Sequence, residues 1–200
     1  LLFPGGAREV FKRRGEEYAL FWPSEPELVR LAARHNATIV PFSAVGGDES
    51  FELVADSDEL LASATPLGAF FRERTAGLPS FVDGDVFVPP VVAPPRGAGP
   101  GGRGGPRMPF FLFGAPRSTA GIDAADADAC AALYGDVQRA VRDGVDYLKQ
   151  ARRDDPFDDE FARRALYEAV TRTAAPSFVP RPFAAADAKG RRLSGNGTAL

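Results

Sequence analysis

The stretch SEPELVRLAARHNATIVPFSAVGG, residues 24–47, contains the helix and the strand that decide the fold. Ser24, Pro26 and Glu27 predict a helix start, with a capping serine, a proline in the first turn and a glutamate in the capping-box position. Apolar residues then recur at helical spacing, which predicts one buried stripe made of Leu28, Leu31, Ala32 and His35. Residues 38–45 are rich in β-branched side chains and end at a double glycine, so they predict a buried strand.

The residues before this stretch predict the same alternation of elements. Leu1–Phe3 is apolar and predicts a buried strand, which ends at Pro4 and at a tight turn of two glycines. Residues 8–18 are highly charged and predict a loop with a short helical turn. A strand, a turn, a helix and a strand in succession are typical of an α/β sheet. Because Leu1 stands inside the predicted strand, we expect the chain to be a piece of a longer protein.

The middle of the chain predicts short elements around a segment of unusual composition. Residues 52–54 predict a short strand, and residues 60–71 predict helical segments interrupted at Pro66. Residues 79–107 are rich in proline and glycine and predict a mobile insertion. Within it, residues 86–95 are apolar but hold four prolines, which excludes a central strand.

The last third predicts one more strand and then helices. Residues 109–114, PFFLFG, are almost wholly apolar and predict a strand buried on both faces. Residues 126–152 form the longest segment in which apolar residues recur at helical spacing, so they predict the longest helix. Asp155 and Pro156 predict the start of another helix, with inward side chains at Phe157, Phe161, Leu166 and Tyr167. The carboxylates of residues 154–160 are expected to be stabilised by that helix dipole. Residues 179–200 predict a flexible tail.

Composition restricts the class of protein. The 200 residues predict one domain with one core. They carry 24 basic and 27 acidic side chains, a formal charge of −3, which argues against nucleic-acid binding. The longest uncharged stretch, residues 60–71, is shorter than the about 20 apolar residues of a spanning helix. Cys130 is the single cysteine, which excludes an internal disulfide. Phe70, Phe71 and residues 81–92 predict either core packing or contact with lipid at a membrane surface.

The double glycine and the charges after it are the candidate functional segment. Gly5 and Gly6 allow a sharp turn that presents N–H groups to an anion or a polarised oxygen, with Arg8 and Glu9 directly after them. An ordinary turn with solvated charges is the alternative on spacing alone. His35, the single histidine, is expected to be a packed side chain and not a catalytic one. The chain lacks the common serine-elbow, zinc-helix and Cys/His motifs, and we predict no metal site and no cofactor.

Several segments of the chain resemble the diacylglycerol acyltransferase-like proteins of plants and algae, within them the plastid phytyl ester synthase branch. The segments are LLFPGGAREVFKRRGEEYALFWP, ELVRLAARHNATIVPFSAVGGDE, PFFLFGAPRST and YGDVQRAVRDGVDYLKQARRDDPF. The resemblance covers residues 1–178, loosely over 79–107, and is most specific over the first 47. It implies that residues 1–178 are the C-terminal half of an acyltransferase domain. The implied fold class is α/β, a glycerolipid-acyltransferase-like mixed sheet flanked by helices and incomplete at its N-terminus.

The resemblance also implies an activity, the transfer of a fatty acyl group from an activated donor to a neutral lipid alcohol. The family's catalytic His-x4-Asp motif lies upstream of the Phe-Pro-Gly-Gly block and does not occur in this chain, so catalytic residues are expected upstream of residue 1. The expected substrate-binding residues are Gly5, Gly6, Arg8 and Glu9. Relatives that act on glycerol phosphates usually carry glutamate at the position of Gly5, so glycine there favours a neutral alcohol, diacylglycerol or phytol.

Further expectations from the resemblance concern support, partners and location. Phe3, Pro4 and Pro41 are expected to support the pocket. The co-substrate is acyl-CoA or acyl carrier protein, with a galactolipid also open as donor. The expected location is the chloroplast, at a plastoglobule, a thylakoid or another lipid surface. The alternative is a catalytically incomplete, lipid-associated piece. A hydrolase is disfavoured because the serine elbow is missing.

Overall fold

The structure is a computed structural model that describes residues 1–76, 88–95, 108–158 and 161–178. Its residues divide into two compact units. The first unit consists of Leu1–Pro23 and Asp48–Pro106, and the second consists of Ser24–Gly47 and Arg107–Leu200. Each unit combines helices with a two-stranded antiparallel sheet, which confirms the mixed α/β class. Among the described residues there are thus two separate small sheets, where the sequence predicts one larger sheet.

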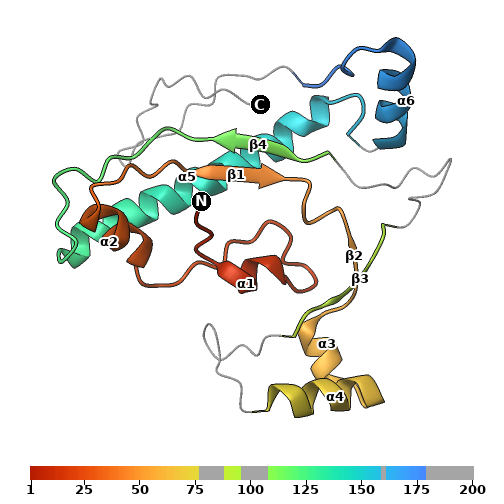
Figure 1. Ribbon diagram of the computed structural model, residues 1–200, viewed down its shortest axis with the longest axis horizontal. Helices are drawn as coiled ribbons and strands as arrows, with labels where there is room; N and C mark the ends of the chain where they lie inside the picture. Colours follow the sequence, from red (N-terminus) through yellow and green to blue (C-terminus); the bar gives the residue numbers. More distant parts are fainter. Residues whose placement is uncertain (77–87, 96–107, 159–160, 179–200) are drawn as a thin grey trace. The chain divides into compact units, whose positions relative to one another are not determined.

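The second unit is built on a sheet and one long helix. Strands β1 (Phe42–Val45) and β4 (Phe110–Phe113) pair antiparallel, and helix α5 (Ala127–Ala151) packs along them (Figure 1). The strand predicted over residues 38–45 is confirmed in its second half, with an isolated bridge between Ile39 and Arg117 before it. The register opposes Ser43 to Leu112 and Val45 to Phe110. Ser43, Val45 and Leu112 are buried.

Strand β4 forms where the sequence predicts it, but it is buried on one face only. Leu112 is buried, whereas Phe111 and Phe113 are 40% and 47% exposed. The prediction of burial on both faces is therefore wrong. The reason is that, among the described residues, helix α5 covers one face of the sheet and no second layer covers the other face, to which alternate side chains of β4 point.

Helix α5 confirms the longest predicted helix almost residue for residue. The Asp126 carboxylate accepts a hydrogen bond from the Ala129 N–H at 3.0 Å and caps the helix. Lys149 lies in the last turn, where the helix dipole favours a cation. The buried face follows the predicted spacing and consists of Cys130, Tyr134, Val137, Ala140, Val141, Gly144, Val145 and Leu148.

Helix α2 (Glu27–Arg34) is confirmed, but its cap and its buried stripe differ from the prediction. Its N-cap residue is Pro26, and no side-chain hydrogen bond caps the helix there, so the predicted Ser24 capping box is wrong. The buried residues are Val29 and Ala32, while Leu31 is exposed. His35 is an exposed C-cap residue and not the packed side chain that the sequence predicts. The face of α2 that packs on α5 and other parts of its unit includes Val29, which is not a member of the predicted stripe.

The chain after α5 turns before it forms a new helix. A 3₁₀ turn, η1 (Arg152–Asp154), follows α5, and α6 (Phe161–Thr171) begins later than the predicted start at Asp155. The Asp155 carboxylate accepts hydrogen bonds from the Phe157 N–H at 2.8 Å and from Arg164 at 2.6 Å. Asp155 therefore closes a turn and binds a buried arginine, and it does not cap a helix at this point.

Some of the side chains that the sequence predicts to be buried after α5 are exposed. Phe157 is buried, as predicted, but Leu166 is 64% exposed and Tyr167 lies at the surface, so those two predictions are wrong. Asp158 forms an ion pair with the buried Arg152 at 2.9 Å. Asp155 and Asp158 are thus bound by arginine side chains, partners that the sequence does not predict.

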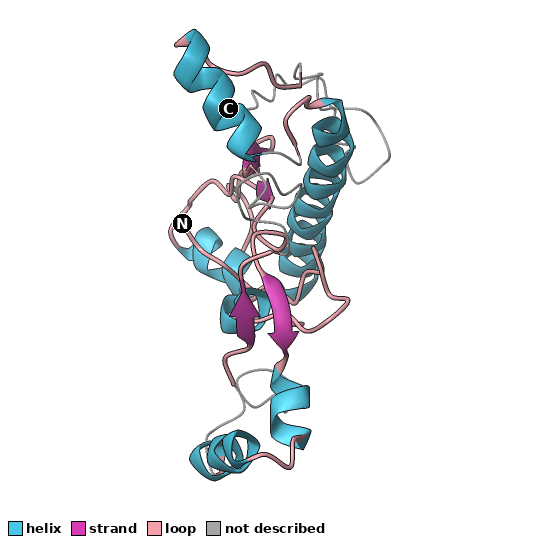
Figure 2. Ribbon diagram, turned by 90° about the vertical axis from the view of Figure 1, so that its right-hand side faces the viewer, coloured by secondary structure: helices cyan, strands magenta, loops and turns pink. Residues whose placement is uncertain are grey.

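The first unit contains α1 (Gly6–Val10), β2 (Glu52–Ala55), α3 (Ser57–Ala62), α4 (Pro66–Thr75) and β3 (Val91–Ala93). Figure 2 shows β2 and β3 side by side as one antiparallel pair. The predicted short helical turn, the short strand and the helix break at Pro66 are confirmed. Pro66 lies in the first turn of α4, behind the Thr65 cap.

The predictions for residues 1–3 and for the 79–107 segment differ from what the structure shows. Leu1–Phe3 forms no strand and its side chains are exposed, so the predicted buried strand is wrong. An apolar run forms a strand only where a neighbour pairs with its backbone, and no described strand pairs with residues 1–3. Val91–Ala93 is a strand inside the predicted 79–107 insertion and pairs with β2. Residues 77–87, 96–107 and the predicted tail, 179–200, lie outside the described residues.

Candidate functional site at the double glycine

The double glycine forms the start of α1. The Gly6 N–H donates to the Phe3 carbonyl at 3.0 Å, and Gly6 has a φ of +52°, in the left-handed region that favours glycine. Gly5 is buried, and a Cβ added there would overlap the Glu9 side chain and lie 2.6 Å from its Oε2. The bend therefore requires both glycines, one for its backbone conformation and one for the space that Glu9 fills.

Glu9 uses that space to reach the chain after α1. Its Oε1 accepts a hydrogen bond from the Phe21 N–H at 3.1 Å. The side chain thus crosses Gly5 and fixes the end of the loop formed by residues 11–21. An Ala in place of Gly5 would displace this carboxylate, because the contact would be shorter than side chains tolerate.

Arg8 is held by a carboxylate and an aromatic ring. Its two terminal nitrogens donate to the two carboxylate oxygens of Glu16 at 2.8 and 2.6 Å, a bidentate pair. Its guanidinium carbon lies 3.8 Å from the centre of the Phe21 ring. The hydrogen bonds from Arg8, and next the N–H of Arg13 at 2.7 Å, lower the pKa of Glu16. The side chain of Arg8 is only 12% exposed.

The basic run behind Arg8 is paired with acidic residues that lie far along the sequence. Lys12 contacts Asp48 at 2.7 Å, and the N–H of Tyr18 donates to the same carboxylate at 2.6 Å. Tyr18 has a φ of +63°, a strained conformation for a bulky residue, which this hydrogen bond stabilises. Lys12 is therefore held in a specific ion pair, whereas the alternative interpretation expects a charge that only water contacts.

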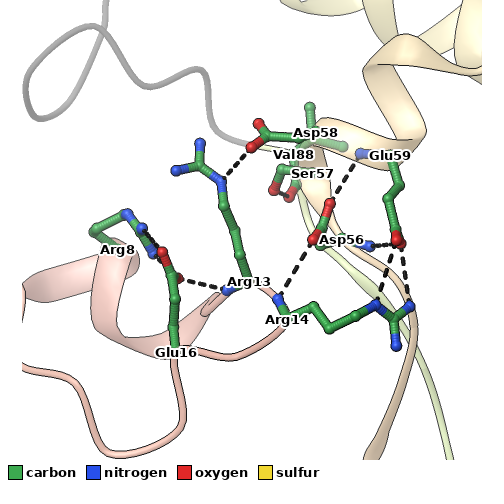
Figure 3. A network of polar contacts seen from close by, with 9 residues as sticks. All are labelled: Arg8, Arg13, Arg14, Glu16, Asp56, Ser57, Asp58, Glu59 and Val88. Atoms are coloured by element: carbon green, nitrogen blue, oxygen red, sulfur yellow. Dashed lines mark hydrogen bonds and ion pairs between the residues drawn. The ribbon is translucent and has the colours of Figure 1, made fainter.

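Arg13 and Arg14 bind the start of α3, as Figure 3 shows. Arg13 forms an ion pair with Asp58 at 2.9 Å, and Arg14 forms one with Glu59 at 3.3 Å. The hydrogen bond from Arg14 lowers the pKa of Glu59. Both arginines therefore connect the candidate segment to the helix that follows β2.

The start of α3 is itself a complete capping box. Asp56 accepts a hydrogen bond from the Glu59 N–H at 2.8 Å, and Glu59 accepts one from the Asp56 N–H at 3.1 Å. The buried Ser57 hydroxyl donates to the Val88 carbonyl at 2.6 Å. The acidic partners of the basic run, Asp48, Asp58 and Glu59, lie more than 30 residues from it along the chain, so spacing does not predict these pairs; the acid-rich composition of residues 48–59 is the available signal.

The predicted site residues are brought together only in part. Gly5, Gly6, Arg8 and Glu9 lie in one turn of chain, with the exposed Phe3 and the half-buried Pro4 directly before them. Pro41 belongs to the second unit, where it is buried and its carbonyl accepts a hydrogen bond from the Gly114 N–H at 2.8 Å. Its predicted role in a pocket stays a prediction.

Among the described residues, no group of three or more His, Cys, Asp or Glu side chains is arranged to hold a metal ion. No helix in the described part of the chain has the length and apolar character that crossing a membrane requires.

Comparison with known proteins gives relatives by sequence. The chain is 37% identical to phytyl ester synthase 1, chloroplastic, of Arabidopsis thaliana over 193 residues, which are 90% of this chain and 26% of that protein. It is 34% identical to phytyl ester synthase 2, chloroplastic, of the same plant over 183 residues, 84% of this chain and 24% of that protein. The chain thus spans about a quarter of the length of these relatives. No family model and no solved structure matches the chain. Over most of its length the chain is therefore similar to a segment of the plastid phytyl ester synthases, as its sequence motifs indicate.

Proposed function

We propose that this chain is part of an O-acyltransferase that forms phytyl esters in the chloroplast. The observation that carries the proposal is the identity of 37% and 34% to two proteins named as chloroplastic phytyl ester synthases. In the proposed reaction, the hydroxyl oxygen of phytol attacks the carbonyl carbon of an activated acyl group. A base takes the hydroxyl proton, a new ester bond forms, and the donor's leaving group departs with a proton.

The proposal assigns proton transfer to a His-x4-Asp pair upstream of residue 1 and acceptor binding to the segment Phe3–Glu9. The oxyanion that develops in acyl transfer requires preorganised donors, each of which contributes about 3 kcal/mol in well-studied enzymes. Gly5 and Gly6 give this segment a sharp bend without side chains. Arg8 and Glu9 hold the bend in place through Glu16 and Phe21.

The charges of the segment support a neutral acceptor. Arg8 is bound by Glu16 through two hydrogen bonds, and the three basic residues after it, Lys12, Arg13 and Arg14, are each paired with a carboxylate. An acceptor with a phosphate group would have to displace one of these carboxylates, whereas an alcohol such as phytol or diacylglycerol requires no such exchange.

The experiment is an assay of the parent protein with labelled acyl-CoA, acyl carrier protein thioester and galactolipid donors against phytol and diacylglycerol. The proposal expects phytyl ester from at least one donor. The alternative is a catalytically incomplete, lipid-associated piece with no activity of its own, for which Arg8→Ala would leave ester synthesis by the parent protein unchanged. The chain alone serves as the negative control, because it lacks the His-x4-Asp motif.

A further inference from the structure

The loop of residues 11–21 carries both partners that hold the candidate segment in place. Glu16 binds Arg8 through two hydrogen bonds (Figure 3), and the Phe21 N–H donates to the Glu9 carboxylate at 3.1 Å. The positions of the Arg8 and Glu9 side chains therefore depend on where the loop places Glu16 and Phe21.

The loop needs contacts from outside to fix this placement, because residues 11–21 form turns and irregular backbone and no helix or strand. Tyr18 lies between Glu16 and Phe21 in the sequence and has a φ of +63°, which side chains other than glycine rarely adopt. Such a conformation persists only where surrounding contacts hold it. The backbone at Tyr18 also sets the direction in which the chain runs from Glu16 to Phe21.

Asp48 supplies such a contact from a distant part of the same unit. Its Oδ2 accepts hydrogen bonds from the Tyr18 N–H at 2.6 Å and from Lys12 Nζ at 2.7 Å. The Lys12 ammonium group in turn lies 5.9 Å from the centre of the Tyr18 ring, a cation–π contact. One carboxylate oxygen thus joins the start of the loop to its strained residue.

Other ion pairs also reach the loop, but they are more exposed to water. Arg13 pairs with Asp58 and Arg14 pairs with Glu59, and these two carboxylate side chains are 63% and 46% exposed, against 25% for Asp48. Exposed ion pairs are screened by water and contribute little. Asp48 is therefore the more buried anchor, and it also binds the loop backbone.

We propose that Asp48 is a positioning residue for the alcohol substrate. It acts through the Tyr18 backbone on Glu16 and Phe21, which hold the segment Phe3–Glu9. The inference rests on the proposed function, since it takes that segment as the part of the chain that binds the acceptor. Loss of the Asp48 carboxylate should weaken binding of the alcohol and leave binding of the acyl donor unchanged, because the displaced segment is assigned to the acceptor.

The first test is a kinetic comparison in the parent protein. Asp48→Ala should raise the KM for phytol several-fold and leave the KM for the acyl donor unchanged. Asp48→Asn keeps an oxygen that accepts from the Tyr18 N–H and loses the charge that binds Lys12, so its KM for phytol should lie between the other two. Thr65→Ala is the matched control: it removes the cap of α4 in the same unit and should leave both KM values unchanged.

The second test is hydrogen exchange in the same variants of the parent protein. Asp48→Ala should accelerate exchange at the amides of Arg13 and Phe21, which donate to Glu16 and Glu9. Thr65→Ala should leave the exchange rates of both amides unchanged. Together the two tests separate a positioning role from a merely structural one, since a structural role would not raise the KM for one substrate alone.

Each remaining outcome decides against the inference. Unaltered kinetics in Asp48→Ala, with phytyl ester formed by the unaltered protein, would overturn it and leave the proposed function standing. An equal rise of the phytol KM in Thr65→Ala would overturn it, because a general loss of stability would then explain the effect. A raised KM without faster exchange at Arg13 and Phe21 would also overturn it, because the effect would not pass through the loop. No phytyl ester from the unaltered parent protein would overturn the proposed function, and the inference with it.

Discussion

The Ser43 hydroxyl occupies the space that a side chain at Gly144 would need. A Cβ added at Gly144 would overlap Ser43 Oγ and lie 2.9 Å from Ser43 Cβ, and the hydroxyl donates to the Val141 carbonyl at 2.9 Å. A glycine in the middle of α5 therefore lets the helix approach β1 closely.

Gly144→Ala should destabilise the chain by about 1–3 kcal/mol, because the added methyl group must push α5 away from β1. Gly135→Ala is the matched control on the same helix, since a Cβ there meets nothing within 4 Å. Alanine is the better helix former by up to about 1 kcal/mol, so that control should be neutral or stabilising. Thermal unfolding followed by circular dichroism measures both. Equal effects of the two substitutions would contradict the close approach.

Gly5→Ala should release Glu9 from its place over the bend, because the new methyl group overlaps the carboxylate. The expected result is faster hydrogen exchange at the Phe21 amide, which donates to Glu9, and lower acyl transfer by the parent protein. Gly47→Ala is the control, since a Cβ there meets nothing within 4 Å. An unchanged Phe21 amide in Gly5→Ala would exclude this role for Glu9.

Arg8→Ala and Glu16→Ala should cost similar stability, about 1.5–3 kcal/mol each, because both remove the same charge-assisted hydrogen bonds. Arg8→Lys should not restore it, since lysine cannot form the bidentate pair or stack on Phe21 in the same way. A double-mutant cycle measures the coupling between the two residues. If Arg8 also orients the acceptor, Arg8→Ala lowers turnover of the parent protein more than Glu16→Ala does. Equal turnover in the two variants would restrict Arg8 to a structural role.

The pairing of Glu16 also predicts a dependence of stability on pH. Arg8 holds the pKa of Glu16 below the ordinary glutamate value of 4.5, so the folded state binds this proton less readily than the unfolded state. The contribution of Glu16 to stability is therefore fully present above that ordinary value and is lost as the pH falls through the lowered pKa. Glu16→Gln should flatten the acid limb of a stability profile measured by urea unfolding. An acid limb of unaltered slope in that variant would contradict the assignment.

The sequence predicts elements best where the pattern is long. The period of residues 126–152 predicts α5 closely, because many residues of one face repeat the same signal. Short apolar runs predict less: Leu1–Phe3 has the composition of a strand but no described partner, and β4 has a single covering layer. Whether such runs form strands, and on how many faces they are buried, depends on neighbours from elsewhere in the chain.

The candidate segment shows the same limit for charged residues. Gly5 and Gly6 were identifiable from the bend that they permit, and the positive φ of Gly6 agrees with it. The partners of Arg13 and Arg14, however, are Asp58 and Glu59, more than 40 residues away. Spacing along the sequence contains no information about such pairs, so a basic run of this kind resembles a solvated surface until the fold is known.

The central claim is that this chain belongs to an acyltransferase whose acceptor is a neutral long-chain alcohol. The most direct measurement gives the parent protein a limiting labelled acyl donor and an equimolar mixture of phytol, diacylglycerol and lysophosphatidic acid, and then quantifies the labelled products. The account predicts that phytyl ester dominates and that phosphatidic acid is a minor product. Phosphatidic acid as the main labelled product would contradict it.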